Sequence, residues 1–340
     1  MYLISPNKKQ FKANLHCHST VSDGKLTPED LKEAYKARGY SVLAITDHEA
    51  PCAHNELSDE DFLMLTGYEA YIRHTADCAY NRYSSEIHLN LFAKDPQNET
   101  MICYNPSYCK YIPQEHKDAL KKAGSQKTRE FSTEYINEFI KTAKDNGYLV
   151  SYNHPYWSME SQEDILAYDG CFSMEMINFS SYVENCLEHN GQLYDALLLA
   201  GKRIFCHGAD DNHNNYPFDS PYNDSFGGAT VILADELKYD KMIDAMESGE
   251  MYSTMGPEIK EVYFDGVNIH IECSEVSKVL VYYGSKNPSK LYAKKGESIT
   301  SADFAADPQL RYIRVSVIDK DGNRADTRGY FRNELGLEAL

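Results

Sequence analysis

The chain has 340 residues, 42% of them hydrophobic, and carries 52 acidic against 34 basic side chains for a net charge of −18. This composition excludes a disordered chain, because there is enough apolar surface to bury a core. No apolar run approaches the roughly 20 residues of a membrane helix, and residues 1–11 lack a signal-peptide core. We therefore expect a soluble cytoplasmic protein without a membrane partner.

The acidic charge is unevenly distributed along the chain. Residues 257–340 hold 12 basic and 13 acidic side chains, so nearly all of the excess precedes them. An acidic surface repels phosphodiester polymers, which favours small substrates over long nucleic acid, although solubility alone explains the same charge. The nine cysteines include no CxxC pair, and we expect them to be reduced and structural.

Short apolar runs alternate with amphipathic stretches over the first 249 residues. This alternation is typical of a β/α fold with a parallel sheet. A long irregular insertion, at about 93–130, interrupts the pattern, and insertions of this length are usually functional or disordered. The expected strands are 12–16, 41–46, 62–67, 87–92, 148–153, 172–177, 203–208 and 229–233.

Three helices are expected between these strands. Thr27 followed by Pro28 provides an N-cap and a first-turn proline for a helix that ends at Gly39. Two further helices should start at a capping side chain, one from Thr133 to residue 146 and one from Asp235 toward residue 248.

The pattern changes after residue 256. Residues 267–271 and 311–317 alternate apolar and polar side chains, and Asp-Gly pairs at 265 and 321 supply hairpin turns. We therefore divide the chain into residues 1–256 and a small all-β, sandwich-like domain of residues 257–340. Three roles fit this second domain: a roof over the active site, a homo-oligomer interface, or a surface for a separate partner.

Histidines and carboxylates gather at the ends of the predicted strands. His16 and His18 lie two residues apart on the first strand, so both imidazoles point to the same side. An HxH pair alone also arises by chance. The carboxyl ends of successive strands meet at one end of a barrel, however, which is where such enzymes place their active sites. Six further residues lie at or after the ends of expected strands, namely Asp23, His48, Glu69, His154, Asp211 and His213, and a seventh, His88, lies within the expected strand 87–92.

The order of these motifs resembles that of the polymerase-and-histidinol-phosphatase (PHP) family. The matching motifs are HxHxxxSDG at 16–24, Thr-Asp-His at 46–48, Glu69, Asn-His-Pro at 153–155 and Asp-Asn-His at 211–213. The resemblance covers roughly residues 11–255. It implies an α/β fold, a distorted (β/α)7 barrel, with two or three divalent metals in a cleft at the strand ends.

The resemblance also implies how the ligands divide among the metals. One metal would be held by His16, His18, Glu69 and Asp211, and a second by Asp23, His48 and His213. Glu69 would bridge to a third metal, held with His88 and His154. Mixed imidazole and carboxylate ligands suit zinc, manganese or iron. Closely spaced metals activate a bridging water, so that hydroxide becomes the nucleophile.

Several other side chains have two interpretations each. Asp47 either orients the imidazole of His48 or caps a strand end. Trp157, the single tryptophan, either lines the pocket or packs under a loop. Four basic side chains either bind phosphate or are solvated surface charges: Arg73, and in the insertion Lys110, Lys121 and Arg129.

The leading functional hypothesis is hydrolysis of a small phosphomonoester. The family resemblance suggests histidinol phosphate, nucleoside monophosphates or nucleoside bisphosphates as substrates. Three alternatives remain: a phosphodiesterase or exonuclease acting on oligonucleotides, an amidohydrolase, and a binding protein that metals merely stabilise. The amidohydrolase is disfavoured because the motifs after the HxH pair fit the phosphoesterase family better.

Overall fold

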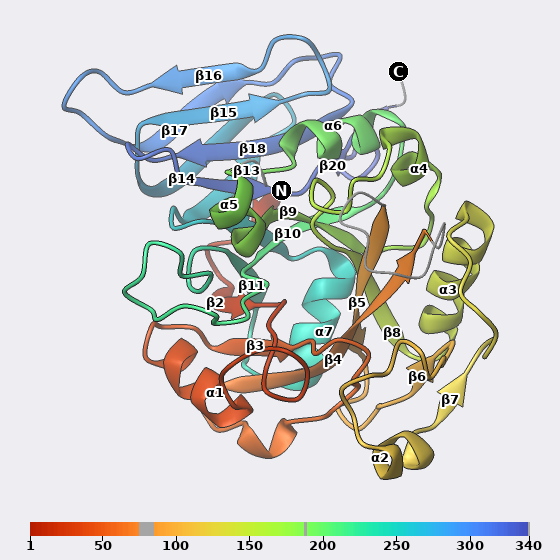
Figure 1. Cartoon of the computed structure of the whole chain (residues 1–340). Coiled ribbons are helices and arrows are strands. Elements are labelled where there is room, and N and C mark those ends of the chain that lie inside the picture. Colours follow the sequence, from red (N-terminus) through yellow and green to blue (C-terminus); the bar gives the residue numbers. More distant parts are fainter. Residues whose placement is uncertain (75–84, 187–188, 339–340) are drawn as a thin grey trace.

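The computed structural model describes residues 1–74, 85–186 and 189–338. A mixed, curved β-sheet forms the frame of the first 256 residues (Figure 1). Its strands in spatial order are β10 (Phe205–Ala209), β9 (Ser173–Asn178), β8 (Tyr148–Tyr152), β5 (Glu86–Ala93), β4 (Leu63–Arg73), β3 (Val42–Ile45), β2 (Lys9–Asn14), β11 (Ala229–Ala234) and β12 (Met251–Thr254).

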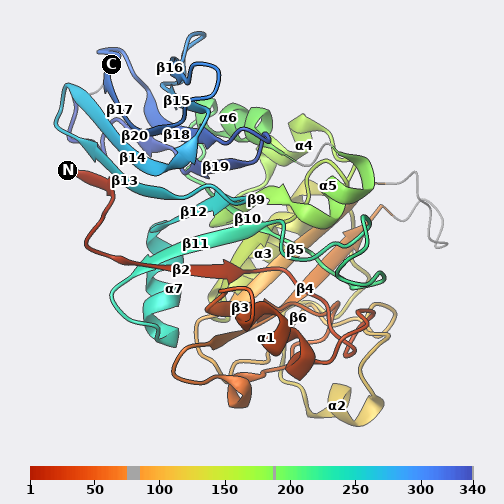
Figure 2. The same ribbon diagram turned by 90° about the vertical axis from the view of Figure 1, so that its left-hand side faces the viewer.

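The sheet confirms a mixed α/β fold, but its strands are not all parallel as predicted. Strands β2, β3 and β4 run parallel, and so do β8, β9 and β10. Strand β5 is antiparallel to both of its neighbours, and β11 is antiparallel to β2 and β12 (Figure 2). Alternating apolar runs do not specify strand direction, so the sequence did not reveal this reversal.

The structure does not show the predicted closed barrel. Within the described residues no strand ladder joins β10 to β11. The two strands meet instead through the Thr230 hydroxyl, which donates to the Gly208 carbonyl (2.7 Å) and accepts from the Gly208 amide (3.2 Å). A Cβ atom at Gly208 would lie 2.6 Å from the carbonyl oxygen of Ala229, so this approach requires glycine.

Helices pack against both faces of the curved sheet. Alternate residues of β8 point to opposite faces, so Leu149 joins the core around α7 and Val150 joins the core around α3. The helices are α1 (Pro28–Lys36), α2 (Gln114–Ala119), α3 (Thr133–Asp145), α4 (Gln162–Ala167), α5 (Phe179–Asn185), α6 (Gly191–Leu199), α7 (Tyr239–Ser248) and the 3-10 turn η1 (Asn55–Leu57).

The helix starts were predicted with mixed success. Thr27 caps α1, as predicted, and accepts a hydrogen bond from the Asp30 amide. Helix α3 is capped by Ser132 rather than Thr133. Helix α7 starts after Lys238, so Asp235 is not its cap. Both errors moved a boundary and left the helix itself in place.

The insertion at 93–130 is folded onto the main core. It contains β6 (Met101–Ile102), α2 and β7 (Lys122–Ala123), and the two strands pair with each other. Its apolar side chains join the core around α3, among them Met101, Ile102 and Ile112. The insertion is therefore part of the packed structure.

After residue 256 the described residues form strands and no helix. One sheet has the order β1-β13-β14-β17, so β1 (Tyr2–Ile4) from the start of the chain belongs to it. The other continues the main sheet beyond β12, and side chains of both sheets share one core. The strands are β13 (Ile259–Phe264), β14 (Asn268–Val276), β15 (Lys278–Tyr282), β16 (Ser289–Tyr292), β17 (Ile299–Ala305), β18 (Tyr312–Ile318), β19 (Arg324–Thr327) and β20 (Tyr330–Phe331).

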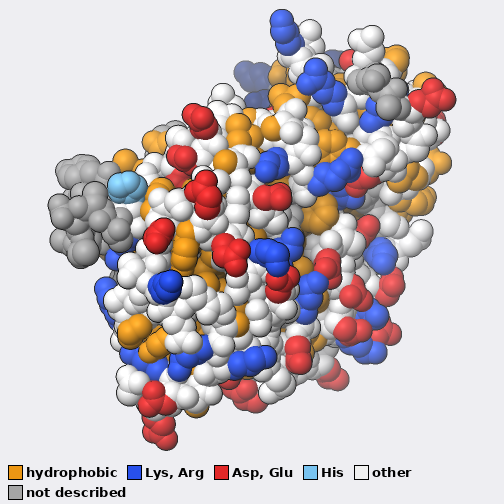
Figure 3. Space-filling model, turned by 90° about the vertical axis from the view of Figure 1, so that its right-hand side faces the viewer, with side chains coloured by type: hydrophobic (Ala, Val, Ile, Leu, Met, Phe, Trp, Pro, Cys, Tyr) orange, Lys and Arg blue, Asp and Glu red, His pale blue; other side chains and the backbone are white. Residues whose placement is uncertain are grey.

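The described residues contain no membrane-length helix, their cysteines are free, and one face of the surface carries mixed charge. In the described ranges no helix is long and apolar enough to cross a membrane. The eight cysteines with described positions are all free. On the face drawn in Figure 3, acidic and basic side chains are interspersed, so this face presents no continuous basic track.

A buried ionic network joins the C-terminal strands to the rest of the chain. Asp326 on β19 is fully buried, and its carboxylate lies 3.0 Å from Arg314 Nη1 and 3.0 Å from His189 Nε2. Arg314 also reaches Asp195 on α6, with Nη2 2.6 Å from Oδ2. Burial alone would raise the pKa of Asp326, but His189, Arg324 and Arg314 outweigh burial and lower it.

We expect Asp326→Asn to lower the free energy of unfolding by about 3–5 kcal/mol at pH 7, because it leaves Arg314 buried without full compensation. The pKa of Asp326 is depressed in the folded state, so its contribution is present above the unfolded pKa of about 3.9 and is lost as the pH falls below it. Urea unfolding at pH 7 and at acidic pH measures both effects.

Asp303→Asn is the matched control. Asp303 is an exposed aspartate of β17 whose partner is His270, and its replacement should change stability by less than about 1 kcal/mol. Equal stability of the two variants at pH 7 would contradict the importance of the Asp326 network.

Candidate metal centre

Backbone hydrogen bonds between two loops bring together the first and the last predicted metal ligands of the chain. Residues 16–18 follow β2 and residues 211–213 follow β10. The His18 amide donates to the Asn212 carbonyl (3.0 Å), and the Asp211 amide donates to the His16 carbonyl (2.9 Å). Asp211 has a φ of 56°, which is costly for a residue other than glycine. Such strain persists where surrounding contacts enforce it, typically at functional sites.

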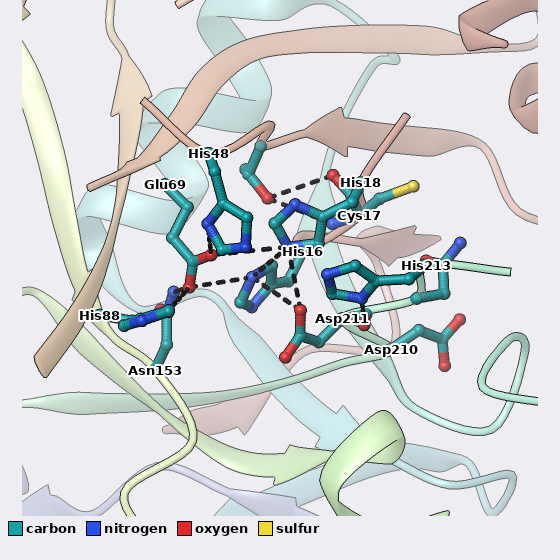
Figure 4. A network of polar contacts seen from close by, with 12 residues as sticks. His16, Cys17, His18, His48, Glu69, His88, Asn153, Asp210, Asp211 and His213 are labelled. Carbon is teal, nitrogen blue, oxygen red and sulfur yellow. Dashed lines mark hydrogen bonds and ion pairs between the residues drawn. The ribbon is translucent and has the colours of Figure 1, made fainter. Parts of the chain in front are cut away.

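One group of side chains surrounds the carboxylates of Glu69 and Asp211 (Figure 4). His16 Nε2 lies 3.2 Å from Glu69 Oε1 and 3.1 Å from Asp211 Oδ1. His18 Nε2 lies 3.0 Å from the same Asp211 oxygen. Ligand atoms of His16, His18 and Glu69 all fall within 4.8 Å of one another, close enough to share one ion.

A second group faces the Asp23 carboxylate. His213 Nε2 is 3.6 Å and His48 Nε2 is 3.9 Å from its oxygens, and His18 Nδ1 is 4.0 Å away. The rings of His18 and His213 stack with centroids 4.2 Å apart. The structure thus adds His18 to the three residues that the family resemblance implied for a second metal.

A third group lies on the other side of Glu69. His48 Nδ1 is 2.9 Å from Glu69 Oε2, and His88 Nδ1 is 2.9 Å from Oε1. His154 Nε2 is 3.4 Å from Oε1. Glu69 therefore borders the first and third groups, which is the geometry that a bridging carboxylate requires. The division of ligands among metals stays a prediction.

The donor set fits a divalent cation. Within the described part of the chain, the ion-pair partners of Glu69 and Asp211 are all histidines. His18 Nδ1 is buried without a hydrogen-bond partner, and His48 Nδ1 and Glu69 Oε2 lie 2.9 Å apart in a geometry that forms no hydrogen bond. Buried polar groups without partners are costly, and coordination would satisfy them. Imidazole and carboxylate ligands suit zinc, manganese or iron.

The pKa values in the cluster shift in both directions. Burial would lower the pKa of His16, His48 and His88, but Glu69 and other carboxylates outweigh burial and raise it, so these rings would release a proton on metal binding. Burial raises the pKa of Glu69, but His88, His16 and His48 outweigh it and hold the pKa well below its usual value. Burial, together with His213 and His48, lowers the pKa of His18 to about 4, so its ring is neutral at pH 7. A deprotonated carboxylate and a neutral imidazole are the forms that bind metals.

Two buried glutamates that the sequence analysis missed hold the histidines in place. Glu175 Oε1 lies 2.7 Å from His16 Nδ1, and Glu86 Oε1 lies 2.6 Å from His88 Nε2. Carboxylates in such positions fix the ring orientation and increase the basicity of the ligating nitrogen. The signal was present in the sequence, because Glu175 stands between two methionines on the apolar strand β9.

Two aspartates next to ligands have structural roles. Asp47 does not contact His48 as one interpretation suggested; it accepts hydrogen bonds from Ser19 and Ser22, both through amide and hydroxyl. It therefore holds the loop that carries Asp23. Asp210, beside Asp211, accepts hydrogen bonds from the Tyr35 hydroxyl and from three amides at 226–228, and it points away from the cluster (Figure 4).

The basic side chains proposed for phosphate binding separate into two classes. Arg73 and Lys110 line the hollow of about 680 Å³ that contains the histidine cluster, and Arg73 pairs with Glu86. Lys121 lines a different hollow. Arg129 is fully buried and forms an ion pair with Glu49, so it cannot reach a phosphate. The sequence could not separate these side chains, because a basic residue type does not reveal whether the side chain is buried or exposed.

The structure defines the surroundings of two further side chains, Trp157 and His207. Trp157 lines the same hollow, with its ring centroid 4.8 Å from that of His154 and 5.2 Å from that of His88. It is therefore a wall residue. His207 is buried, and its Nδ1 lies 3.0 Å from the Ser173 hydroxyl.

A family comparison matches part of this chain. The PHP domain matches residues 14–152. The matched segment contains His16, His18, Asp23, His48, Glu69 and His88. It ends before His154, Asp211 and His213, which the fold brings to the same cluster.

A curated relative matches a short stretch of the chain. A 5'-3' exoribonuclease of Haemophilus influenzae is 43% identical over 65 residues, which make up 17% of this chain and 23% of the relative. The chain therefore matches less than a quarter of that relative's length.

Three solved structures are similar to this chain at low sequence identity. A two-domain protein of Bacteroides vulgatus containing a predicted PHP-like metal-dependent phosphoesterase is 13% identical, with 96% of this chain and 97% of that chain covered and a TM-score of 0.42. A protein of Bifidobacterium adolescentis described as a metal-dependent phosphoesterase is 18% identical, with 69% of this chain and 94% of that chain covered and a TM-score of 0.41. An amidohydrolase of Chromobacterium violaceum with bound sulfate and no metal is 15% identical (59% and 87%, TM-score 0.38).

We expect Glu175→Gln to weaken zinc binding by about 10- to 100-fold, because an amide supports the His16 ring less strongly than a carboxylate does. Competition with a chromogenic chelator measures the affinity, and circular dichroism checks the fold. Glu272→Gln, at a solvent-exposed position of β14, is the control and should bind zinc like the wild type. Equal affinity of both variants would show that Glu175 does not support the site.

Proposed function

We propose that this chain, which carries a PHP domain over residues 14–152, is a metal-dependent phosphoesterase that hydrolyses a small phosphomonoester. The observation that carries the proposal is the convergence of nine histidine and carboxylate side chains in one cluster, seven of which line a single hollow. They come from loops and strands up to almost 200 residues apart, and they gather around the carboxylates of Glu69, Asp211 and Asp23. Scattered surface histidines would not share one buried cluster.

The protein's residues would bind and orient the substrate in this hollow. Bound divalent ions would act as Lewis acids toward the phosphoryl oxygens and lower the pKa of a water. Glu69 and Asp211 would hold these ions from inside the fold, while Arg73 and Lys110 on the wall add positive charge toward the phosphate. Glu86 reduces the positive charge that Arg73 can offer to a phosphate, because the Arg73 guanidinium already pairs with the Glu86 carboxylate.

The direct test measures phosphate release from a panel of phosphomonoesters. Protein from which a chelator has removed the metals should be inactive, and adding zinc, manganese or iron should restore hydrolysis. Asp211→Asn should lower kcat/KM by about 100-fold or more, because several kcal/mol of transition-state stabilisation depend on the metal site. Asp303→Asn, far from the cluster in sequence and exposed on β17, should retain full activity. Metal-loaded protein no more active than Asp211→Asn on every substrate would refute the proposal.

A second candidate function is removal of nucleotides from the end of an oligonucleotide. The short match to the Haemophilus influenzae exoribonuclease favours it, while the net charge of −18 opposes binding of a long strand. An RNA oligonucleotide labelled at its 3' end distinguishes the two. Progressive shortening from the 5' end, at a rate above that of phosphomonoester hydrolysis, would make this the principal activity.

A further inference from the structure

Two exposed tyrosines stand together at the histidine cluster. Tyr216 and Tyr222 lie on the loop between His213 and Asp224, and both line the hollow that contains Asp211 and His213. Their side chains are 52% and 62% exposed, and the ring centroids are 5.3 Å apart at an interplanar angle of 42°. Single exposed apolar side chains are ordinary, whereas contiguous ones can mark a groove for a ligand or a surface for a partner.

The loop that carries the two rings is fixed by its own hydrogen bonds. Asp224 accepts from the amides of His213 (2.8 Å) and Asn214 (3.2 Å), which ties the far end of the loop to a predicted metal ligand. Within the loop, the Ser220 amide donates to the Pro217 carbonyl, and the Tyr222 amide donates to the Ser220 hydroxyl. The rings are therefore held in place relative to the cluster instead of being exposed by a loose segment.

The hollow is larger than a phosphate group needs. Its volume of about 680 Å³ lies within the range of about 300–1,000 Å³ that is usual for pockets of organic ligands. A third aromatic side chain, Tyr111 of the insertion, also lines it, with its hydroxyl 3.3 Å from Asp23 Oδ2 and its ring stacked on that of His48. The hollow thus combines an interior of predicted metal ligands with aromatic walls.

Resting on the phosphoesterase function proposed above, we propose that Tyr216 and Tyr222 form a stacking platform that selects phosphoesters whose leaving group carries a planar heteroaromatic base. The phosphate lies at the histidine cluster, and the base lies on the tyrosine rings. Stacking on an aromatic side chain strengthens binding by roughly 5- to 150-fold per base and does not depend strongly on which base is present. The tyrosine pair therefore determines the substrate class.

The kinetic test compares adenosine 5'-monophosphate with ribose 5-phosphate, which has the same phosphate and sugar without the base. We expect the wild type to hydrolyse the nucleotide with a kcat/KM at least about fivefold higher. Tyr216→Ala and Tyr222→Ala should lose this preference while keeping the rate on ribose 5-phosphate. Tyr216→Phe and Tyr222→Phe should keep the preference, because the ring remains.

Phe218→Ala is the matched control. Phe218 is an exposed aromatic residue of the same loop, but it packs against Arg38 and Phe226 and is not part of the wall of the hollow. Its replacement should leave both rates unchanged. Loss of the preference in Phe218→Ala as well would mean that the shape of the loop, and not the tyrosine platform, sets it, and this would overturn the inference.

A binding measurement keeps the inference testable if neither compound is hydrolysed. Trp157 is the single tryptophan and lines the hollow, so its fluorescence in the zinc-loaded protein reports ligand binding. Tighter binding of the nucleotide than of ribose 5-phosphate, lost in the alanine variants, would support the platform even if the proposed hydrolysis failed. Equal affinity for the two compounds, or equal weakening of both in the alanine variants, would overturn the platform and leave the phosphoesterase proposal intact.

Discussion

The Glu69 carboxylate is the group on which the whole cluster depends. It is fully buried on β4, and five imidazoles approach its two oxygens: His16, His18, His48, His88 and His154. A buried carboxylate without positive partners is very costly, so its ionised state requires protonated histidines or a cation. The histidines come from different parts of the sheet, so their common contact with Glu69 exists only when those strands are packed together.

The supporting contacts explain why the cluster is ordered enough to bind ions. Asn153 donates to Glu69 Oε1 (2.8 Å), and Asn178 donates to Asp211 Oδ2 (3.1 Å). Glu175 accepts from the His154 amide (2.7 Å) in addition to contacting the His16 ring. These side chains each hold a ligand from behind, and a ligand that is already oriented loses less conformational entropy on binding. Asn153 directly follows β8, and Glu175 and Asn178 lie on β9.

The sequence predicted the α/β class and most of the strands, but their directions were wrong in places. Strand β5 was expected to run parallel, yet it is antiparallel to β4, the strand that precedes it in the chain and lies beside it in the sheet. This pairing also explains the position of His88, which lies within its strand rather than at the end. Because β4 and β5 are an antiparallel pair, the start of β5 lies beside the end of β4, and His88 still reaches Glu69.

The sequence by itself determined the types of ligand and where they stand along the chain, because histidine and carboxylate motifs at strand ends are local features. Only the tertiary structure decided which neighbouring charges take part. Asp210 and Asp211 are adjacent, yet one anchors a backbone turn and the other faces the histidines. Arg129 proved to be buried against Glu49, and Glu175 proved to support His16. Side-chain direction and burial arise from packing between distant segments, and no local pattern contains that information.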